Sequence, residues 1–429
     1  MASSLGIDIG TTSISFAVVD GNEVIYTSSS CNSSAVKENN DYQNADIIFE
    51  TVKDETDKIL KNYKIESIGF TGQMHGIVYT DDNGLAVSPL YTWKTQTGNL
   101  IYKDGYTFCD YIFNLTGKRV STGYGLVTEF VNLKTNNFHT GKICTIGDYA
   151  AMRLCGSRIP AVHSSNAASF GFYDCSKKRF DAESLSKLGI STEILPEITN
   201  DRKIIGEYKG VPVCVSIGDN QASFMGSVEK GNCLINIGTG GQVSVRTLNT
   251  VEDLKNGIEL RPFNGDEYLL VYSSLCGGRA YALLERFVRD IFSAGGYECK
   301  NAYDILNKSA VQTYLSRTDL KTSTLFSGTR QNPDKRAEIK DITENNFKIG
   351  DISLSFLEGI ADEICTALNK IEKIIDSKQN IIFASGNGIQ KNNLLRQIFE
   401  EKLGRKLILS SYKEEAAVGA AKFAGGYSV

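Results

Sequence analysis

The stretch that decides the fold is Gly6 to Asp20, GIDIGTTSISFAVVD. It has the pattern of an apolar strand, a short turn and a second strand, with the carboxylate of Asp8 inside the first strand. Backbone N–H groups in such a glycine turn bind anions, and Thr and Ser add hydroxyl donors. Asp8 would then face phosphate through a divalent cation; the alternative is that it caps backbone amides of an ordinary turn. The residues of the candidate phosphate turn are Gly10, Thr11, Thr12 and Ser13.

A second stretch of the same character begins at Cys233, CLINIGTGGQVSVR, with Gly238, Thr239 and Gly240 at its turn. This faint internal repeat indicates a duplicated nucleotide-binding fold, because two such turns can bind one polyphosphate. It favours phosphate binding over simple capping. The length of 429 residues also exceeds the size at which one hydrophobic core stops growing, so two domains are expected.

Short β-branched runs alternate with helical patterns along the chain, which is typical of an α/β protein. Apolar residues at spacings of three and four predict a long helix over 356–375. Asp81 to Gly84, DDNG, predicts a hairpin turn. Further helices are predicted at 46–63 and 393–403, and strands at 65–70, 76–80, 211–217, 233–237 and 381–384.

Composition and missing motifs exclude several classes of function. The 46 basic and 50 acidic residues give a net charge of −4 without a long run of one sign, so we expect no nucleic-acid or membrane partner. No apolar stretch is long enough to span a bilayer and no leader is evident, so we expect a cytoplasmic protein. The ten cysteines form no CxxC pair, and the chain lacks GxxxxGK[ST], HRD, DFG, HExxH and GxSxG.

Two further segments carry candidate chemistry. In Val211 to Gly226, VPVCVSIGDNQASFMG, Asp219 follows a strand at the edge where open α/β sheets bind ligands. A carboxylate there suits proton transfer from a hydroxyl that attacks phosphorus, although an Asp before a helix is often an N-cap. In Ile381 to Gly404 a strand, a glycine turn and an amphipathic helix follow one another, which can seat adenine or ribose but is also a common α/β connection.

Taken in order, these motifs resemble the FGGY family of carbohydrate kinases, within the actin-like ATPase superfamily, and most closely its sedoheptulokinase branch. The resemblance runs nearly end to end. Besides the segments already quoted, it rests on SIGFTGQMHGIVY (67–79), TIGDYAAMRLCG (145–156), SSNAASFGFYD (164–174), LPEI (195–198), SSLCGGRAY (273–281), SGNGIQKNNLLRQ (385–397) and EEAAVGAAKFA (414–424).

The resemblance implies an α/β fold of two actin-like, ribonuclease H-like domains, each a mixed β-sheet flanked by helices, with an interdomain cleft. Residues 1–226 would form a sugar-binding domain with the first phosphate hairpin and the catalytic Asp, and residues 227–429 a nucleotide-binding domain. The expected activity is transfer of the ATP γ-phosphate to a hydroxyl of a ketose such as sedoheptulose or xylulose. ATP and Mg²⁺ would be the cofactors, a small-molecule sugar the partner, and a homodimer is allowed.

The resemblance also implies residue roles. Asp219 would be the general base and, with Asp8, lie near the metal. The turns of both hairpins would contact phosphate. The sugar pocket would contain Gln73, Met74 and His75, with Asn220 beside the base; a lone His is more often core or surface filler, and His75 is favoured only through its motif. The adenosine site would contain Gly386, Asn387 and Asn392.

The chain departs from the family pattern in two places. Thr95 and Thr97, in YTWKTQTGN, stand where the family usually has Asp and Arg, and residues 387–390 replace consecutive glycines. The first departure motivates an alternative, a catalytically weakened kinase-fold protein that binds sugar or nucleotide as a regulatory module. A third possibility is an actin-like ATPase or chaperone of another kind, against which the QMHG and NAASFG segments argue.

Overall fold

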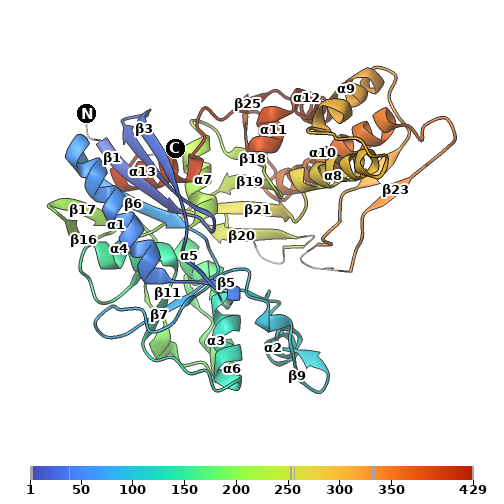
Figure 1. Ribbon diagram of the computed structural model, residues 1–429. Coiled ribbons are helices and arrows are strands. Elements are labelled where there is room, and N and C mark those ends of the chain that lie inside the picture. Colours follow the sequence, from blue (N-terminus) through green and yellow to red (C-terminus); the bar gives the residue numbers. More distant parts are fainter. Residues whose placement is uncertain are drawn as a thin grey trace. The chain divides into compact units, whose positions relative to one another are not determined.

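The computed structural model describes residues 3–37, 39–251, 254–255, 257–329, 332 and 334–427 (Figure 1). The chain forms two compact units. The sequence-based division after residue 226 lies close to the end of the first long segment, but the C-terminal segment packs with the first unit again. The first unit comprises Met1–Glu229, Arg261–Tyr268 and Tyr412–Val429, and the second comprises Lys230–Leu260 and Leu269–Ser411.

The first unit is built on a mixed six-stranded sheet in the order β16-β17-β6-β1-β2-β3. Its central strand β1 pairs antiparallel with β2 and parallel with β6. Leu5, Ile7 and Ile9 of β1 point to one face of the sheet and are fully buried there. The strands are β1 (Ser3–Ile9), β2 (Ser13–Asp20), β3 (Glu23–Cys31), β6 (Ile65–Gly72), β16 (Ile204–Tyr208) and β17 (Val211–Cys214).

Helix α13 packs on this sheet through small residues. A Cβ at Gly6 in β1 would lie 1.9 Å from the carbonyl oxygen of Ala417, so the helix approaches the strand at backbone distance. Ala417 and Ala421 contact Ala17 and Val19 of β2 in one apolar cluster. The described helices of this unit are α1 (Ala45–Asn62), α2 (Phe108–Thr116), α3 (Gly125–Lys134), α4 (Ile146–Leu154), α5 (Ser164–Ser169), α6 (Ala182–Leu188), α7 (Asp219–Ser227) and α13 (Glu415–Gly425).

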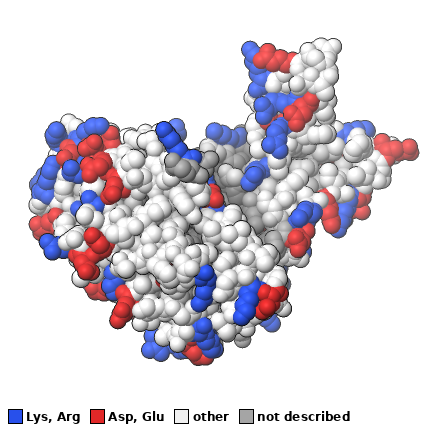
Figure 2. All heavy atoms as spheres, turned by 60° about the horizontal axis from the view of Figure 1, so that its bottom comes forward, with Lys and Arg blue, Asp and Glu red and all other residues white. Residues whose placement is uncertain are grey.

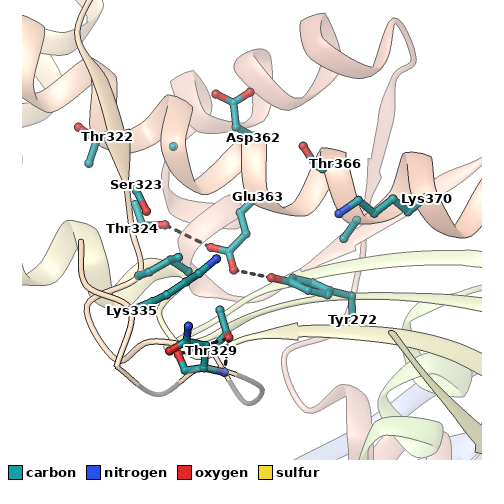
Figure 3. Close-up of a pocket in the computed structure, with 14 residues that line it drawn as sticks. Tyr272, Thr322, Ser323, Thr324, Thr329, Lys335, Asp362, Glu363, Thr366 and Lys370 are labelled. Carbon is teal, nitrogen blue, oxygen red and sulfur yellow. Dashed lines mark hydrogen bonds between the residues drawn. The ribbon is translucent and has the colours of Figure 1, made fainter. Parts of the chain in front are cut away.

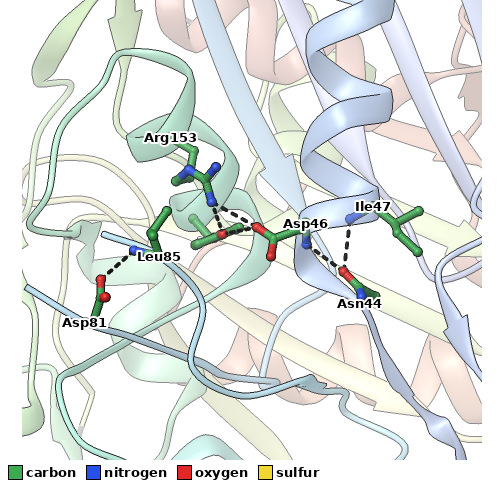
Figure 4. Close-up of polar contacts among 7 residues, drawn as sticks. Asn44, Asp46, Ile47, Asp81, Leu85 and Arg153 are labelled. Atoms are coloured by element: carbon green, nitrogen blue, oxygen red, sulfur yellow. Dashed lines mark hydrogen bonds and ion pairs between the residues drawn. The ribbon is translucent and has the colours of Figure 1, made fainter. Parts of the chain in front are cut away.

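Helices α1 and α4 are joined by a polar contact at the start of α1 (Figure 4). Asn44 caps α1, because its Oδ1 accepts from the N–H groups of Asp46 and Ile47 at 3.0 Å each. The carboxylate of Asp46 then accepts from Arg153 at 2.9 Å and from the Tyr149 hydroxyl at 2.6 Å, both on α4. This contact holds the helix that carries Asp148, a residue beneath the candidate site.

Shorter elements complete the first unit. The predicted DDNG turn is present, since the N–H of Gly84 donates to the carbonyl of Asp81 at 2.9 Å. The minor strands are β4 (Ala35–Val36), β5 (Asn39–Gln43) and β8 (Leu90–Tyr91) in one sheet, and the pairs β7 (Val78–Thr80) with β11 (Lys142–Cys144), β9 (Ile101–Lys103) with β10 (Tyr106–Thr107), β12 (Ala161–His163) with β15 (Glu197–Thr199), and β13 (Tyr173–Asp174) with β14 (Arg179–Phe180); two 3₁₀ turns are η1 (Thr97–Asn99) and η2 (Thr192–Ile194).

The second unit has its own six-stranded sheet, in the order β20-β21-β19-β18-β24-β25. β18 pairs antiparallel with β19 and parallel with β24, as β1 does with β2 and β6. The faint sequence repeat therefore corresponds to the same strand arrangement, and the expected mixed α/β fold is confirmed. The strands are β18 (Cys233–Ile237), β19 (Gly241–Thr247), β20 (Ile258–Pro262), β21 (Tyr268–Ser274), β24 (Ile382–Ser385) and β25 (Leu407–Leu409), with β22 (Lys321–Ser323) and β23 (Glu338–Lys340) as a separate pair.

The predicted long helix is α10, and it begins earlier than its apolar spacing indicates. Its first turns contain small residues that let it approach α9: a Cβ at Gly350 would lie 2.2 Å from the hydroxyl of Thr313. Because this contact is made by a glycine, the first turns of α10 do not show the regular spacing of apolar residues that predicts the rest of the helix. The described helices of the second unit are α8 (Gly278–Ala294), α9 (Tyr303–Tyr314), α10 (Ile349–Ile374), α11 (Asn387–Lys391) and α12 (Asn393–Leu403).

Acidic and basic side chains are interspersed on the face shown in Figure 2. Among the helices of the described ranges, none combines the length and the apolar character that a membrane crossing needs.

Candidate active site

The turn of the first hairpin is held through its carbonyl groups. Asn32 donates to the carbonyl of Gly10 and Gln43 donates to that of Thr11, both at 2.9 Å. In the described part of the chain the backbone N–H groups of Thr11 and Thr12 have no acceptor. The anchored turn therefore leaves N–H donors open, which is the arrangement that binds an anion.

The side chains around this turn fix the hydroxyl of Thr11. It donates to Oε1 of Gln73 at 3.3 Å and accepts from the indole N–H of Trp93 at 3.1 Å. Gln73 is buried, and its Nε2 donates to Gln43 at 2.7 Å. The structure thus places Gln73, a predicted sugar ligand, in the support of the phosphate turn, with both ends of its amide engaged.

Asp8 and Asp219 lie close enough to interact electrostatically. Burial, together with the negative charges of Asp219 and Glu414, raises the pKa of Asp8 from 3.8 to about 7, and burial makes the largest contribution. Within the described ranges the Asp8 carboxylate accepts no hydrogen bond, so it is not the cap of a turn. Glu414, at the start of α13, is a charged neighbour that sequence reasoning did not single out.

Asp219 is the first residue of α7, and the N-cap position belongs to Gly218. Asp219 is therefore not the N-cap of α7. Gly218 is crowded: a Cβ there would lie 2.5 Å from Oε1 of Gln221 and 3.0 Å from Cε of Met74. Met74, predicted for the sugar pocket, thus packs under the backbone that carries Asp219.

A buried polar network holds the strand end before Asp219. The N–H of Gly218 donates to the hydroxyl of Ser165 at 2.9 Å, and Ser165 lies 2.8 Å from Nδ1 of His163. Because Nδ1 also accepts from the N–H of Ser165, Nε2 carries the proton and donates to the carbonyl of Asn200 at 3.1 Å. Burial lowers the pKa of His163 to about 4, so this link stays neutral.

Asn166 and Asp148 form the second half of that network. Nδ2 of Asn166 donates to the carbonyl of Ser216 and to Oδ1 of Asp148, each at 3.2 Å. Burial raises the pKa of Asp148 to about 7, against the effect of its hydrogen bonds with Thr145. The sequence carries no local signal for these contacts, because only the fold brings Asn166 and Asp148 to the backbone that precedes Asp219.

His75 occupies a constrained position. Its φ of 73° is in the left-handed region, and its ring stacks on Tyr124 with centroids 4.5 Å apart. Nδ1 faces the carbonyl of Ser169 at 2.9 Å, so Nδ1 carries a proton and donates. Asn220, buried beside Asp219, accepts from Arg261 at 3.4 Å. These contacts fix the orientation of His75 and Asn220.

The turn of the second hairpin is closed by the start of α8. The N–H groups of Gly278 and Arg279 donate to the carbonyls of Gly238 and Thr239 at 3.0 and 3.1 Å. A Cβ at Gly277 would lie 2.3 Å from the carbonyl oxygen of Gly240, so glycine is required for this approach. As in the first hairpin, the neighbours engage the carbonyl groups of the turn.

A cavity of about 570 Å³ opens beside this turn, within the second unit. Of the predicted nucleotide residues, Gly238, Thr239, Asn387 and Asn392 line it, whereas Gly240 and Gly386 lie in the adjoining turns. Tyr281, Tyr303 and Asn307 also line the cavity and were not predicted. The cavity thus joins a phosphate-type turn to a wall of aromatic, amide and apolar side chains.

A second cavity of the same unit, about 640 Å³, lies between α10 and β22 (Figure 3). Its central carboxylate, Glu363, accepts from the Tyr272 hydroxyl at 2.8 Å and from Thr324 at 3.3 Å. It contains neither glycine turn, so it does not share the features of the nucleotide cavity.

Comparison with known proteins places this chain among carbohydrate kinases. The family model described as FGGY family of carbohydrate kinases, N-terminal domain, matches residues 3–226, and the C-terminal domain model matches residues 237–426. The sedoheptulokinase of Homo sapiens is 25% identical over 389 residues, which cover 83% of this chain and 80% of that protein.

Two solved structures have the same fold. The xylulose kinase from Lactobacillus acidophilus, ligand bound, gives a TM-score of 0.81 at 20% identity, over 99% of this chain and 90% of that one. The Plasmodium falciparum glycerol kinase with ADP gives a TM-score of 0.80 at 20% identity, over 99% of this chain and 89% of that one. The likeness establishes the two-domain, actin-like fold.

Proposed function

Because the chain belongs to the FGGY family of carbohydrate kinases, and is therefore a sugar kinase, we propose that it transfers the γ-phosphoryl group of ATP to a hydroxyl of a ketose. Sedoheptulose is the first candidate, since the human sedoheptulokinase is 25% identical, and xylulose is the second. The first domain, residues 1–226, would bind the sugar, and the second, residues 227–429, the nucleotide.

The observation that carries the proposal is the pairing of Asp8 with Asp219. The two carboxylates come from distant parts of the sequence, and each raises the cost of ionising the other. Asp8 is the last residue but one of β1, which leads into the candidate phosphate turn, and Asp219 begins α7 directly after Gly218, whose N–H is held by Ser165. Two half-buried carboxylates that repel each other cost stability, and such a pair is more common at functional sites than in purely structural positions.

In the proposed reaction Asp219 accepts the proton of the sugar hydroxyl. The hydroxyl oxygen forms a bond to the γ-phosphorus as the bond from phosphorus to the β,γ-bridging oxygen breaks, and ADP leaves with that oxygen. His75, held by Ser169 and Tyr124, would hydrogen-bond the sugar and fix which hydroxyl faces Asp219. Positioning and charge stabilisation supply most of the rate increase in such transfers.

The residues present fit a divalent cation. The Asp8 carboxylate accepts no hydrogen bond in the described ranges, and the buried Oγ1 of Thr71, its in-register neighbour on β6, has no partner there. No three His, Cys, Asp or Glu side chains of that part of the chain form a metal cluster, so phosphate oxygens and water would complete the coordination, as is usual for Mg²⁺. Asp8 and Asp219 would hold the ion, which when bound neutralises charge on the phosphates.

The nucleotide assignment rests on the cavity of the second unit. The related glycerol kinase was solved with ADP, and the cavity here joins the turn at Gly238 and Thr239 to Asn387 and Asn392. The turn would contact the phosphates and the asparagines the adenosine. ATP is therefore the proposed phosphoryl donor.

The test is a coupled measurement of ADP release over a panel of ketoses and polyols. The proposal predicts turnover that depends on the sugar, strongest with a ketose such as sedoheptulose, and a phosphorylated sugar among the products. Hydrolysis of ATP that is independent of sugar would instead indicate an actin-like ATPase.

A second candidate, a regulatory module that binds sugar or nucleotide without useful turnover, is motivated by Thr95 and Thr97. Thr95 is 1% exposed, and its hydroxyl has no hydrogen-bond partner in the described ranges. A neutral residue thus fills a buried place where the family usually has a charged one. Binding of sugar by calorimetry without ADP release would support this candidate.

A further inference from the structure

We propose that Asn307, on α9, donates a hydrogen bond from its Nδ2 to a ring nitrogen of the adenine base of ATP, and so helps to bind and orient that base. The inference rests on the proposed use of ATP. No motif in the sequence pointed to Asn307, and it follows from the hydrogen bonds at the wall of the nucleotide cavity.

The orientation of the Asn307 amide follows from the N-cap of α12, because the capping residue Asn392 also hydrogen-bonds Asn307. Oδ1 of Asn392 accepts from the N–H of Leu395 at 2.9 Å and caps α12, so the other end of that amide, Nδ2, must be a donor. Nδ2 of Asn392 contacts Asn307 at 3.1 Å, and the atom it meets must therefore be the acceptor Oδ1.

The contact with Tyr281 is compatible with this orientation. The hydroxyl of Tyr281 donates to the same Oδ1 of Asn307 at 3.1 Å. With both bonds at Oδ1, the two N–H groups of Nδ2 have no acceptor in the described part of the chain. A half-buried amide that lines a cavity with its donors unused is suited to bind an acceptor on a ligand.

The place of the base follows from the other walls of the cavity. Gly238 and Thr239 form the phosphate end, so the nucleoside occupies the rest of the 570 Å³. That part contains Tyr281 and Tyr303, with ring centroids 6.0 Å apart, and apolar side chains such as Leu395. A purine there would contact aromatic and apolar surface and present its ring nitrogens, which are acceptors, to a donor.

The main test is Asn307→Asp, because Asp keeps the structural role and removes the donor. Its carboxylate still accepts from Tyr281 and Asn392, but an acceptor now replaces Nδ2. We expect the Kd for ATP, measured by titration calorimetry, to rise about tenfold or more, with the KM for sugar unchanged. The matched control is Asn249→Asp, which adds the same charge at an exposed position of the same unit, outside the cavity, and should leave both constants unchanged.

Analogues of ATP that lack one ring nitrogen each, 1-deaza, 3-deaza and 7-deaza, identify the bonded atom. The wild-type protein should bind one of them several-fold more weakly than ATP, and Asn307→Asp should bind that analogue and ATP alike. A purely structural role for Asn307 would weaken all nucleotides equally and would contradict the proposal.

Two other results would also overturn the inference. The first is unchanged ATP binding by Asn307→Asp. The second is that the variant binds ATP and 2′-deoxy-ATP alike while it still distinguishes the deaza analogues as the wild-type protein does, which would place the donor at the ribose. Because binding is measured without turnover, the proposed function is tested separately. A chain that binds ATP with this pattern but phosphorylates no sugar would retain the assignment of Asn307 and refute the kinase activity.

Discussion

The two hairpins occupy equivalent places in their sheets, and the four residues that lead into each turn differ at one position. In the first, Asp8, Ile9, Gly10 and Thr11 follow one another; in the second the same positions are Asn236, Ile237, Gly238 and Thr239. Both strands have a parallel neighbour with a hydroxyl residue in register, Thr71 beside Asp8 and Ser385 beside Asn236.

The surroundings of these two residues show what the difference means. Asn236 donates to the hydroxyl of Ser385 at 2.8 Å, so both polar groups are satisfied. Asp8 and Thr71, in contrast, have no hydrogen-bond partner in the described ranges, and Asp219 faces Asp8 with a further negative charge. The second turn thus lacks a carboxylate, whereas the first has an electrostatic repulsion between Asp8 and Asp219 that the proposed cation would relieve.

Asp8→Asn makes the first hairpin resemble the second and should have the largest effect among the hairpin variants. Loss of the carboxylate should reduce kcat by about 100-fold or more, because the proposed cation then loses a ligand. ATP binding should change much less, since the nucleoside cavity is in the other unit. Steady-state kinetics over a Mg²⁺ titration measures both, and an unchanged kcat would remove Asp8 from the reaction.

The reverse exchange, Asn236→Asp, places a carboxylate at the second hairpin. The fold should persist, because the hydroxyl of Ser385 can turn to donate to the new carboxylate. The negative charge beside Gly238 should repel the phosphates and raise the KM for ATP about tenfold or more, with the KM for sugar unchanged. Equal effects on both constants would show that the two hairpins do not divide their roles in this way.

His75→Ala tests the sugar side of the same division. Removing the ring that stacks on Tyr124 should raise the KM for sugar about fivefold, the cost of one hydrogen bond, and leave the KM for ATP within error. Initial rates with each substrate varied at saturation of the other give the two constants. If both rose together, His75 would not belong to the sugar pocket.

The smallest expected effect is on stability. Because the pKa of Asp8 is about 7 in the folded protein and near 3.8 unfolded, the folded state binds the extra proton between these values, and Asp8 makes stability fall as pH rises from about 4 to 7. Without divalent cations, Asp8→Asn should therefore be more stable than the wild-type protein at pH 8, and the difference should become small at pH 4. Urea unfolding at both pH values measures the difference; a pH-independent difference would contradict the shifted pKa.

Local sequence signals predicted the hairpins and the strand ends, because a glycine turn or a carboxylate after a strand is visible within a few residues. Asp8 and Asp219 could be named in this way. The support of Asp219 could not, since Ser165, His163 and Asn166 act on it only after α5 and β12 fold against the strand end.

The sequence also could not predict contacts made through glycine, or through side chains that hydrogen-bond one another. The amide of Gln73 hydrogen-bonds Thr11 and Gln43, and the spacing of these residues in the sequence does not predict either contact. The return of α13 to the first unit depends on backbone contact at Gly6, where the absence of a side chain is the signal. The Asp8 to Asn236 exchange was readable from the repeat itself, once the two hairpins are aligned.

The most direct test of the account is Asp219→Asn, assayed for sugar-dependent ADP release and, in parallel, for ATP binding by calorimetry. An amide cannot accept the proton of the sugar hydroxyl, so turnover should fall by about 10²- to 10⁴-fold while the Kd for ATP stays within a factor of about two. Near-normal turnover by this variant would contradict the assignment of Asp219 as the base, and with it the division of roles between the two hairpins.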